Sequence, residues 1–124
     1  MSEPQDPVVA LLARAAAAYP GASADFPWGD RVAKVDGKVF VFLGADETTE
    51  PSVSVKLPRS AHYALSLASC RPTSHGLGKA DWVTIRLGQP SSPDDELLLE
   101  WLEESYRARA GRRNLALLDT TKRP

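Results

Sequence analysis

Side chains at outward positions of two predicted strands could together bind phosphate groups. The segment Val53–Leu57 alternates apolar and polar residues, which is typical of a half-buried strand. Lys56 holds a polar position there, and Trp82 and Arg86 hold equivalent positions in the segment Trp82–Leu87. In one sheet, these cations and the aromatic would share a surface able to grip phosphates and stack on a base. With cations on neighbouring elements, the candidate nucleic-acid-binding residues are Lys34, Lys38, Lys56, Lys79, Trp82 and Arg86.

The size of Trp82 leaves a second interpretation open. A large aromatic at this position can instead close a small second core under the long loops. The neighbouring predicted strand does not decide between the two interpretations. Val39 to Leu43 is apolar throughout, so its pattern does not show which side chains point toward the core.

Metal binding and covalent catalysis find weaker support. His62, His75 and Cys70 match no zinc spacing, and a structural zinc site needs four ligands. Cys70 and His75 lie in one predicted loop, without a third group to orient the histidine as a base. The sequence therefore predicts a non-enzymatic protein with no metal and no cofactor.

The segment Gly76–Lys79 resembles part of a phosphate-binding loop. Thr73 stands where the first glycine is needed, Ala80 replaces the residue that holds magnesium, and a strand is predicted to follow. Two glycines beside a lysine can still form a backbone nest for an anion, or simply a tight loop. An enzyme or small-molecule binder that uses this loop is the third interpretation.

The predicted elements indicate an α+β domain. They are a helix from Asp6 to the Pro20-Gly21 stop, strands over 31–35, 38–43, 53–57 and 82–87, a helix over 58–68, and a last helix capped by Ser92 and ended by Gly111. Residues 20–30 and 69–81 are predicted loops. Asp36-Gly37 is a strong hairpin turn, because both central positions of such a turn need positive φ. Hairpin-joined strands favour an antiparallel sheet of four or more strands with helices packed on one face, in the order α-β-β-β-α-β-α.

Length and composition indicate one soluble globular domain. The chain has 124 residues, of which 43% are hydrophobic and 25% charged, so we expect a single domain over 1–124 with an ordered core from about 6 to 118. One cysteine allows no intrachain disulfide, and no apolar run is long enough to span a membrane. The N-terminal residues do not have the pattern of a signal peptide. We therefore expect a cytoplasmic location.

The overall charge argues against strong nonspecific DNA binding. The net charge is −1 and the pI is about 6.1, whereas dedicated nucleic-acid binders usually have a pI above about 9. The distribution is uneven, because residues 31–90 carry eight basic and five acidic side chains. A modest basic face is therefore expected in the middle of the chain.

Five short motifs in order resemble the MmcQ/YjbR family. They are Phe26–Gly29, Lys34–Phe40, Val53–Leu57, Gly76–Lys79 followed by Trp82-Val83, and Leu97–Tyr106. The resemblance extends over nearly the whole chain, to about residue 118. It implies a compact α+β domain with an antiparallel sheet, described as a double-wing DNA-binding fold and also likened to the frataxin-type fold.

The sequence departs from the family pattern at one position and from the frataxin pattern at another. Many family members have an asparagine before the lysine that is Lys79 here, and this chain has Gly78 instead. Any ligand contact of that asparagine is therefore absent. Iron binding of the frataxin type relies on an acidic first helix, and the first predicted helix has no acidic residue after Asp6.

Two functional hypotheses follow. The first is a DNA-binding protein whose basic sheet face contacts the phosphate backbone of double-stranded DNA. The alternative is a protein-interaction or regulatory module that binds no nucleic acid. Several cations around an exposed Trp82 would favour the first, and a buried Trp82 with scattered lysines would favour the second.

Overall fold

Six antiparallel strands form one open sheet in the order β1-β2-β3-β4-β6-β5. The structure is a computed structural model, and it describes residues 4–45 and 50–122. The strands are β1 (Ser23–Asp25), β2 (Arg31–Val35), β3 (Lys38–Gly44), β4 (Ser52–Lys56), β5 (Cys70–Pro72) and β6 (Trp82–Arg86). The helices are α1 (Pro7–Ala18), α2 (Ala61–Ala64), α3 (Asp95–Arg109) and α4 (Arg112–Lys122), with short 3₁₀ helices η1 (Pro27–Gly29) and η2 (Leu77–Ala80).

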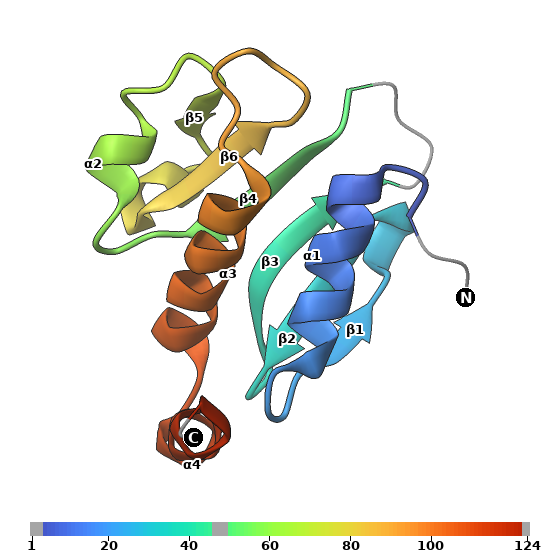
Figure 1. The fold of residues 1–124 in the computed structure, drawn as a ribbon, viewed down its shortest axis with the longest axis vertical. Helices are drawn as coiled ribbons and strands as arrows, with labels where there is room; N and C mark the ends of the chain where they lie inside the picture. Colours follow the sequence, from blue (N-terminus) through green and yellow to red (C-terminus); the bar gives the residue numbers. More distant parts are fainter. Residues whose placement is uncertain (1–3, 46–49, 123–124) are drawn as a thin grey trace.

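Helices α1 and α3 lie against one face of the sheet. They contact each other, and both contact β3 (Figure 1). The core between the two layers includes Phe40, Leu57 and Tyr106, none of which exposes any of its surface. The predicted α+β class with an antiparallel sheet is confirmed.

Local sequence signals fix the first helix and the first hairpin. The Asp6 carboxylate accepts hydrogen bonds from the backbone N–H groups of Val8 (2.9 Å) and Val9 (3.0 Å), as an N-cap should. Asp36 and Gly37 have φ values of 52° and 76°, which is the geometry of a two-residue hairpin turn. Both elements lie where the sequence predicts them.

Two strands lie inside segments predicted as loops. β1 is exposed at all three residues, so it has no apolar alternation, and only its backbone pairing with β2 defines it. β5 ends at Pro72, a residue that within sheets is confined to edges because it has no N–H to donate. The predictions of loops over 20–30 and 69–81 are wrong at these positions.

The middle helix is shorter than predicted, and the last predicted helix starts later. α2 ends early because the Ser66 hydroxyl donates to the Tyr63 carbonyl oxygen (2.5 Å), which competes with continued helix. The Ser92 hydroxyl serves a preceding turn, donating to the Arg86 carbonyl oxygen (2.6 Å). Asp94 caps α3 instead, and its carboxylate accepts from the Leu97 N–H (2.9 Å). The predicted helix over 58–68 is therefore present but confined to Ala61–Ala64, and the predicted Ser92 cap is wrong.

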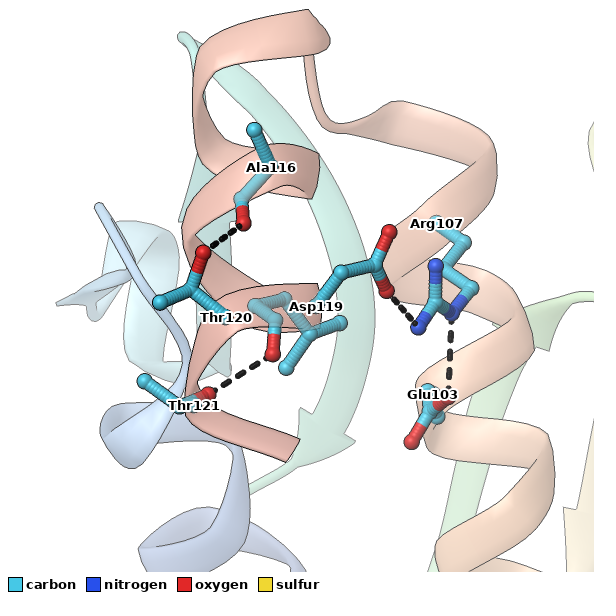
Figure 2. A network of polar contacts seen from close by, with 7 residues as sticks. Glu103, Arg107, Ala116, Asp119, Thr120 and Thr121 are labelled. Atoms are coloured by element: carbon cyan, nitrogen blue, oxygen red, sulfur yellow. Dashed lines mark hydrogen bonds and ion pairs between the residues drawn. The ribbon is translucent and has the colours of Figure 1, made fainter. Parts of the chain in front are cut away.

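Helix α4 follows the position at which the sequence predicts the last helix to end. The C-cap of α3 is Ala110, and Gly111 only separates the two helices. Figure 2 shows one link between them, in which the Arg107 guanidinium donates to Glu103 on α3 (2.9 Å) and to Asp119 on α4 (2.8 Å). Leu118 of α4 is buried in the core.

The hairpin turn also holds the start of α4. The Asp36 carboxylate accepts from the Gly111 N–H (2.6 Å) and from the Asn114 side-chain amide (3.1 Å). Both bonds lower the pKa of Asp36, and the bond from Gly111 has the larger effect. A carboxylate at a helix N-terminus is also favoured by the helix dipole.

The lowered pKa of Asp36 predicts an acid-dependent contribution to stability. This contribution is present above the pKa of Asp36 in the unfolded protein, which is about 4. It is lost as the pH falls through the lower pKa of Asp36 in the folded protein. We expect wild type to be more stable than Asp36→Asn at pH 7 and this difference to shrink below about pH 4. Urea unfolding of both proteins from pH 7 to pH 2 measures it, and a difference that does not change with pH would contradict the assignment.

A serine hydroxyl joins α3 to the sheet where β3 and β4 separate. These strands pair at Val41 with Val55 and at Phe42 with Ser54. One residue further on, the Ser105 hydroxyl lies between the strands, donating to the Phe40 carbonyl oxygen (2.5 Å) and accepting from the Lys56 N–H (2.8 Å). Ser105 is completely buried, so it satisfies two backbone groups that the strands leave unpaired.

Candidate nucleic-acid interface

Strand register brings three cations to the face of the sheet opposite α3. Lys56 of β4 is opposite Trp82 of β6, and Arg86 of β6 is opposite Ser52 of β4. Side chains two residues apart on a strand share a face, so Lys56 and Arg86 lie on the same side of the sheet, as predicted. Arg71 of β5 is opposite Thr84 and joins them. We call this surface, made of Lys56, Arg71, Lys79 and Arg86, the basic face.

Lys79 belongs to the basic face through a contact of Lys56. The Lys56 ammonium group donates to the Ala80 carbonyl oxygen (2.5 Å), which places its charge beside η2. Lys79 is the residue before Ala80, and its side chain is exposed. Lys79 therefore adjoins along the chain the residue that the Lys56 ammonium contacts, and it is included in the basic face on that ground.

Hydroxyl side chains fill the space between the cations. The Thr84 hydroxyl lies 2.8 Å from that of Ser54 and 2.9 Å from that of Thr73. Arg86 has an acidic neighbour at longer range, since its guanidinium is 3.9 Å from the Glu50 carboxylate and both side chains are largely exposed. An exposed pair of this kind contributes little to stability.

Trp82 lies among these cations but is not available to stack on a base. Only 5% of its surface is exposed, and its ring packs edge-on against Phe42 with 5.3 Å between centroids. Trp82 therefore closes a small second cluster on this face, which is one of the two interpretations that the sequence leaves open. The exposed part of the basic face consists mainly of charged groups, because Ser54 and Thr84 are themselves buried.

The other two predicted cations lie on the far half of the sheet. Lys34 is on β2 and forms an ion pair with Asp25 of β1 (3.0 Å), which lowers the pKa of Asp25. Lys38 begins β3 beside the hairpin turn. Strands β3 and β4 separate Lys34 from β6. Lys38 lies three residues before Val41, where the pairing of β3 with β4 begins, so neither lysine is part of the basic face.

Arg71 is the cation that strand prediction misses. The sequence predicts a loop over 69–81, so no register could be assigned to this residue. The available signal was its neighbour Pro72, because a proline after two strand-compatible residues is typical of an edge strand.

The glycines of Gly76–Lys79 have local structural roles. Gly76 has a φ of 80°, a left-handed conformation that glycine adopts without strain. A Cβ atom on Gly78 would lie 2.6 Å from the Cβ atom of Pro72, so only glycine allows η2 to pack this closely against β5. These two needs explain the glycines without an anion.

Cys70 and His75 do not form a nucleophile and base pair. Burial raises the pKa of the half-buried Cys70 thiol, and the Cys70 sulfur lies 3.8 Å from the Ser69 hydroxyl. The His75 ring is exposed and lies 3.0 Å from the Ser74 hydroxyl. A raised pKa disfavours the reactive thiolate, so the geometry gives no support to covalent chemistry here.

Neither a metal-binding cluster nor a membrane-spanning helix is found among the described residues. Within residues 4–45 and 50–122, no three His, Cys, Asp or Glu side chains gather in a way that could hold a metal ion. None of the helices in these ranges has the length and apolar character needed to cross a membrane.

Comparison with known proteins places the chain in a family. No curated protein sequence matches it. The family model described as YjbR matches residues 17–108, from the end of α1 to the end of α3, including all six strands. The match does not include α4, whose N-terminal end is hydrogen-bonded to the Asp36 carboxylate. Because the matched segment covers well over half of the sequence, the chain belongs to the YjbR family.

Proposed function

We propose that this protein binds double-stranded DNA through its basic face. The observation that carries the proposal is the strand register, which places Lys56, Arg71 and Arg86 on one side of β4, β6 and β5. Diagonal neighbours on adjacent strands lie roughly 7–8 Å apart, so Arg71 and Arg86 can contact successive phosphates. Lys79 extends the surface at the η2 end.

The burial of Trp82 is what the alternative, a protein-interaction module, leads one to expect, whereas the gathering of Lys56, Arg71 and Arg86 favours DNA binding. This burial also limits the kind of DNA binding that the basic face can support. Without an exposed aromatic, the surface offers cations, and these contact phosphates. Phosphate contacts position a protein on DNA but carry no sequence information. We therefore propose backbone binding with little sequence preference and a strong dependence on salt.

Charge reversal at two ends of the basic face is the test of this site. The double variant Lys56→Glu, Arg86→Glu removes two phosphate contacts and adds two repulsive charges. We expect it to show no binding of a labelled 20-base-pair duplex up to about 100 μM protein, the weak end of nonspecific affinity. Fluorescence anisotropy at 50 mM salt measures the loss relative to wild type.

A matched double variant controls for net charge. Arg112→Glu, Arg113→Glu makes the same change in charge on exposed residues of α4, at the opposite end of the molecule from β5 (Figure 1). We expect it to keep affinity within about threefold of wild type, since charges beyond a Debye length are largely screened. Equal losses in both double variants, or full retention in the first, would show that the basic face is not the binding site.

A further inference from the structure

A groove lies between α2 and α3, outside the basic face. It has a volume of about 580 Å³ and is lined by the loop before α2, by α2 and by α3. The lining residues of α3 include Leu97, Glu100, Trp101 and Glu104, whose spacing of three and four residues places them on one side of the helix. A shallower hollow of about 310 Å³ continues the groove along α3, sharing Leu97 and Glu100 with it.

The floor and one wall of the groove are aromatic. Trp101 is 3% exposed and forms part of the floor, whereas Tyr63 of α2 keeps 57% of its surface exposed. The two rings meet edge to face with centroids 6.4 Å apart. Exposed tyrosine beside a buried tryptophan is the kind of surface that proteins use to hold an inserted side chain, because tyrosine and tryptophan dominate binding energy at interfaces.

The wall of the groove beside α2 is held rigidly by a buried carboxylate. Glu104 accepts from the Arg59 N–H (2.8 Å), the Ser60 N–H (3.0 Å) and the Ser60 hydroxyl (2.6 Å). Glu104 is 7% exposed. These three bonds fix the loop before α2 to α3, so the groove is largely formed before any partner arrives.

The charges along the groove are predominantly acidic. Acidic side chains outnumber basic ones in the two hollows, with Asp94, Glu96, Glu100, Glu103 and Glu104 against Arg59 and Arg107. The Arg107 guanidinium already binds two carboxylates, Glu103 and Asp119 (Figure 2), so its positive charge is compensated. Glu96 and Glu100 remain exposed beside the apolar floor.

We infer that this groove binds a short basic segment of a partner protein, with one large apolar side chain on Tyr63 and Trp101 and flanking Lys or Arg side chains on Glu96 and Glu100. The length of the groove along α3 fits a short extended peptide. From Asp94 to Arg107 the helix rises roughly 20 Å, and about six extended residues cover that distance. A cation over Tyr63 would add a cation–π contact. This inference concerns a different surface from the basic face and does not depend on DNA binding.

Two peptides of opposite charge test the inference on the full chain. The probes are acetyl-Lys-Arg-Leu-Phe-Lys-Arg-amide and acetyl-Asp-Glu-Leu-Phe-Asp-Glu-amide. We expect the basic peptide to bind, and in two-dimensional ¹⁵N–¹H NMR spectra to shift the Trp101 indole signal and the amides of Tyr63 and Glu100. The acidic peptide should cause none of these shifts at the same concentration. The absence of any shift with about 1 mM basic peptide would overturn the inference, because a dissociation constant of about 1 mM corresponds to a binding free energy of only about −4 kcal/mol. Stronger binding of the acidic peptide would also overturn it.

Matched charge reversals separate the groove from general attraction. Glu100→Lys combined with Tyr63→Ser changes two exposed groove residues and is expected to weaken binding of the basic peptide at least tenfold. Asp30→Lys reverses an exposed carboxylate before β2, outside the groove, and should leave affinity within about twofold. Equal weakening by both variants, or shifts confined to the β4, β5 and β6 amides, would show that the peptide does not occupy the groove.

Discussion

Replacing Ser105 with alanine is expected to lower the free energy of unfolding by about 2–4 kcal/mol, because two buried backbone groups lose their partner and each unsatisfied group costs about 1–3 kcal/mol. The groups are the Phe40 carbonyl and the Lys56 N–H, both bonded to the Ser105 hydroxyl. Ser105 is completely buried, so little water can replace the hydroxyl. Urea unfolding at pH 7 measures the change.

An exposed serine serves as the control for Ser105. Ser66 also donates its hydroxyl to a backbone carbonyl, that of Tyr63, but on the surface. We expect Ser66→Ala to change stability by no more than about 0.5 kcal/mol, as surface substitutions usually do. A similarly small effect of Ser105→Ala would mean that β3 and β4 can pair directly at Phe40 and Lys56, without the hydroxyl.

Trp101→Ala is expected to destabilise the protein by about 3–5 kcal/mol, the usual cost of emptying a large aromatic site in a core. Trp101 is 3% exposed and belongs to the main core cluster. The loss should appear as a lower urea midpoint with an unchanged slope. Leu117→Ala, on a side chain that is 47% exposed, should cost far less.

The outcome for Trp101 also bears on the groove. If Trp101→Ala lowers the free energy of unfolding by less than about 1 kcal/mol, well under the range for core aromatics, then the Trp101 side chain does not stabilise the core. The floor of the groove would then be less tightly packed than the burial of Trp101 indicates, and the placement of α3 would need revision.

Elements defined by their own residues were predictable from the sequence. The Asp6 cap and the Asp36-Gly37 turn depend on interactions within a few residues, and both lie where expected. The alternation of Val53–Leu57 predicts the strand β4 but not its burial, because Ser54 is buried as well as Val53 and Val55. In these segments, local propensity and side-chain pattern point to the same structure.

Elements defined by distant partners were not predictable. β1 has no apolar pattern of its own. The start of α4 is held by Asp36, 75 residues before Gly111, and Ser105 serves strands 65 and 49 residues away. Such contacts depend on tertiary structure, which a local pattern does not contain.

The candidate site also has features that local sequence predicts and features that depend on tertiary structure. The side of the sheet that Lys56 and Arg86 occupy follows from strand alternation, and the register confirms that they share it. The burial of Trp82 depends on Phe42, which lies two strands away in the sheet. The absence of Lys34 from the basic face depends on the strand order, which the sequence did not determine.

The measurement that tests DNA binding by the basic face most directly is the salt dependence of wild-type affinity for a labelled duplex. Four phosphate contacts, by Lys56, Arg71, Lys79 and Arg86, predict a slope of about −3.6 in log affinity against log salt, or a loss of roughly 150-fold between 50 and 200 mM. A slope near this value would support backbone binding by the basic face. No binding at 50 mM salt up to about 100 μM protein, or an affinity independent of salt, would contradict it.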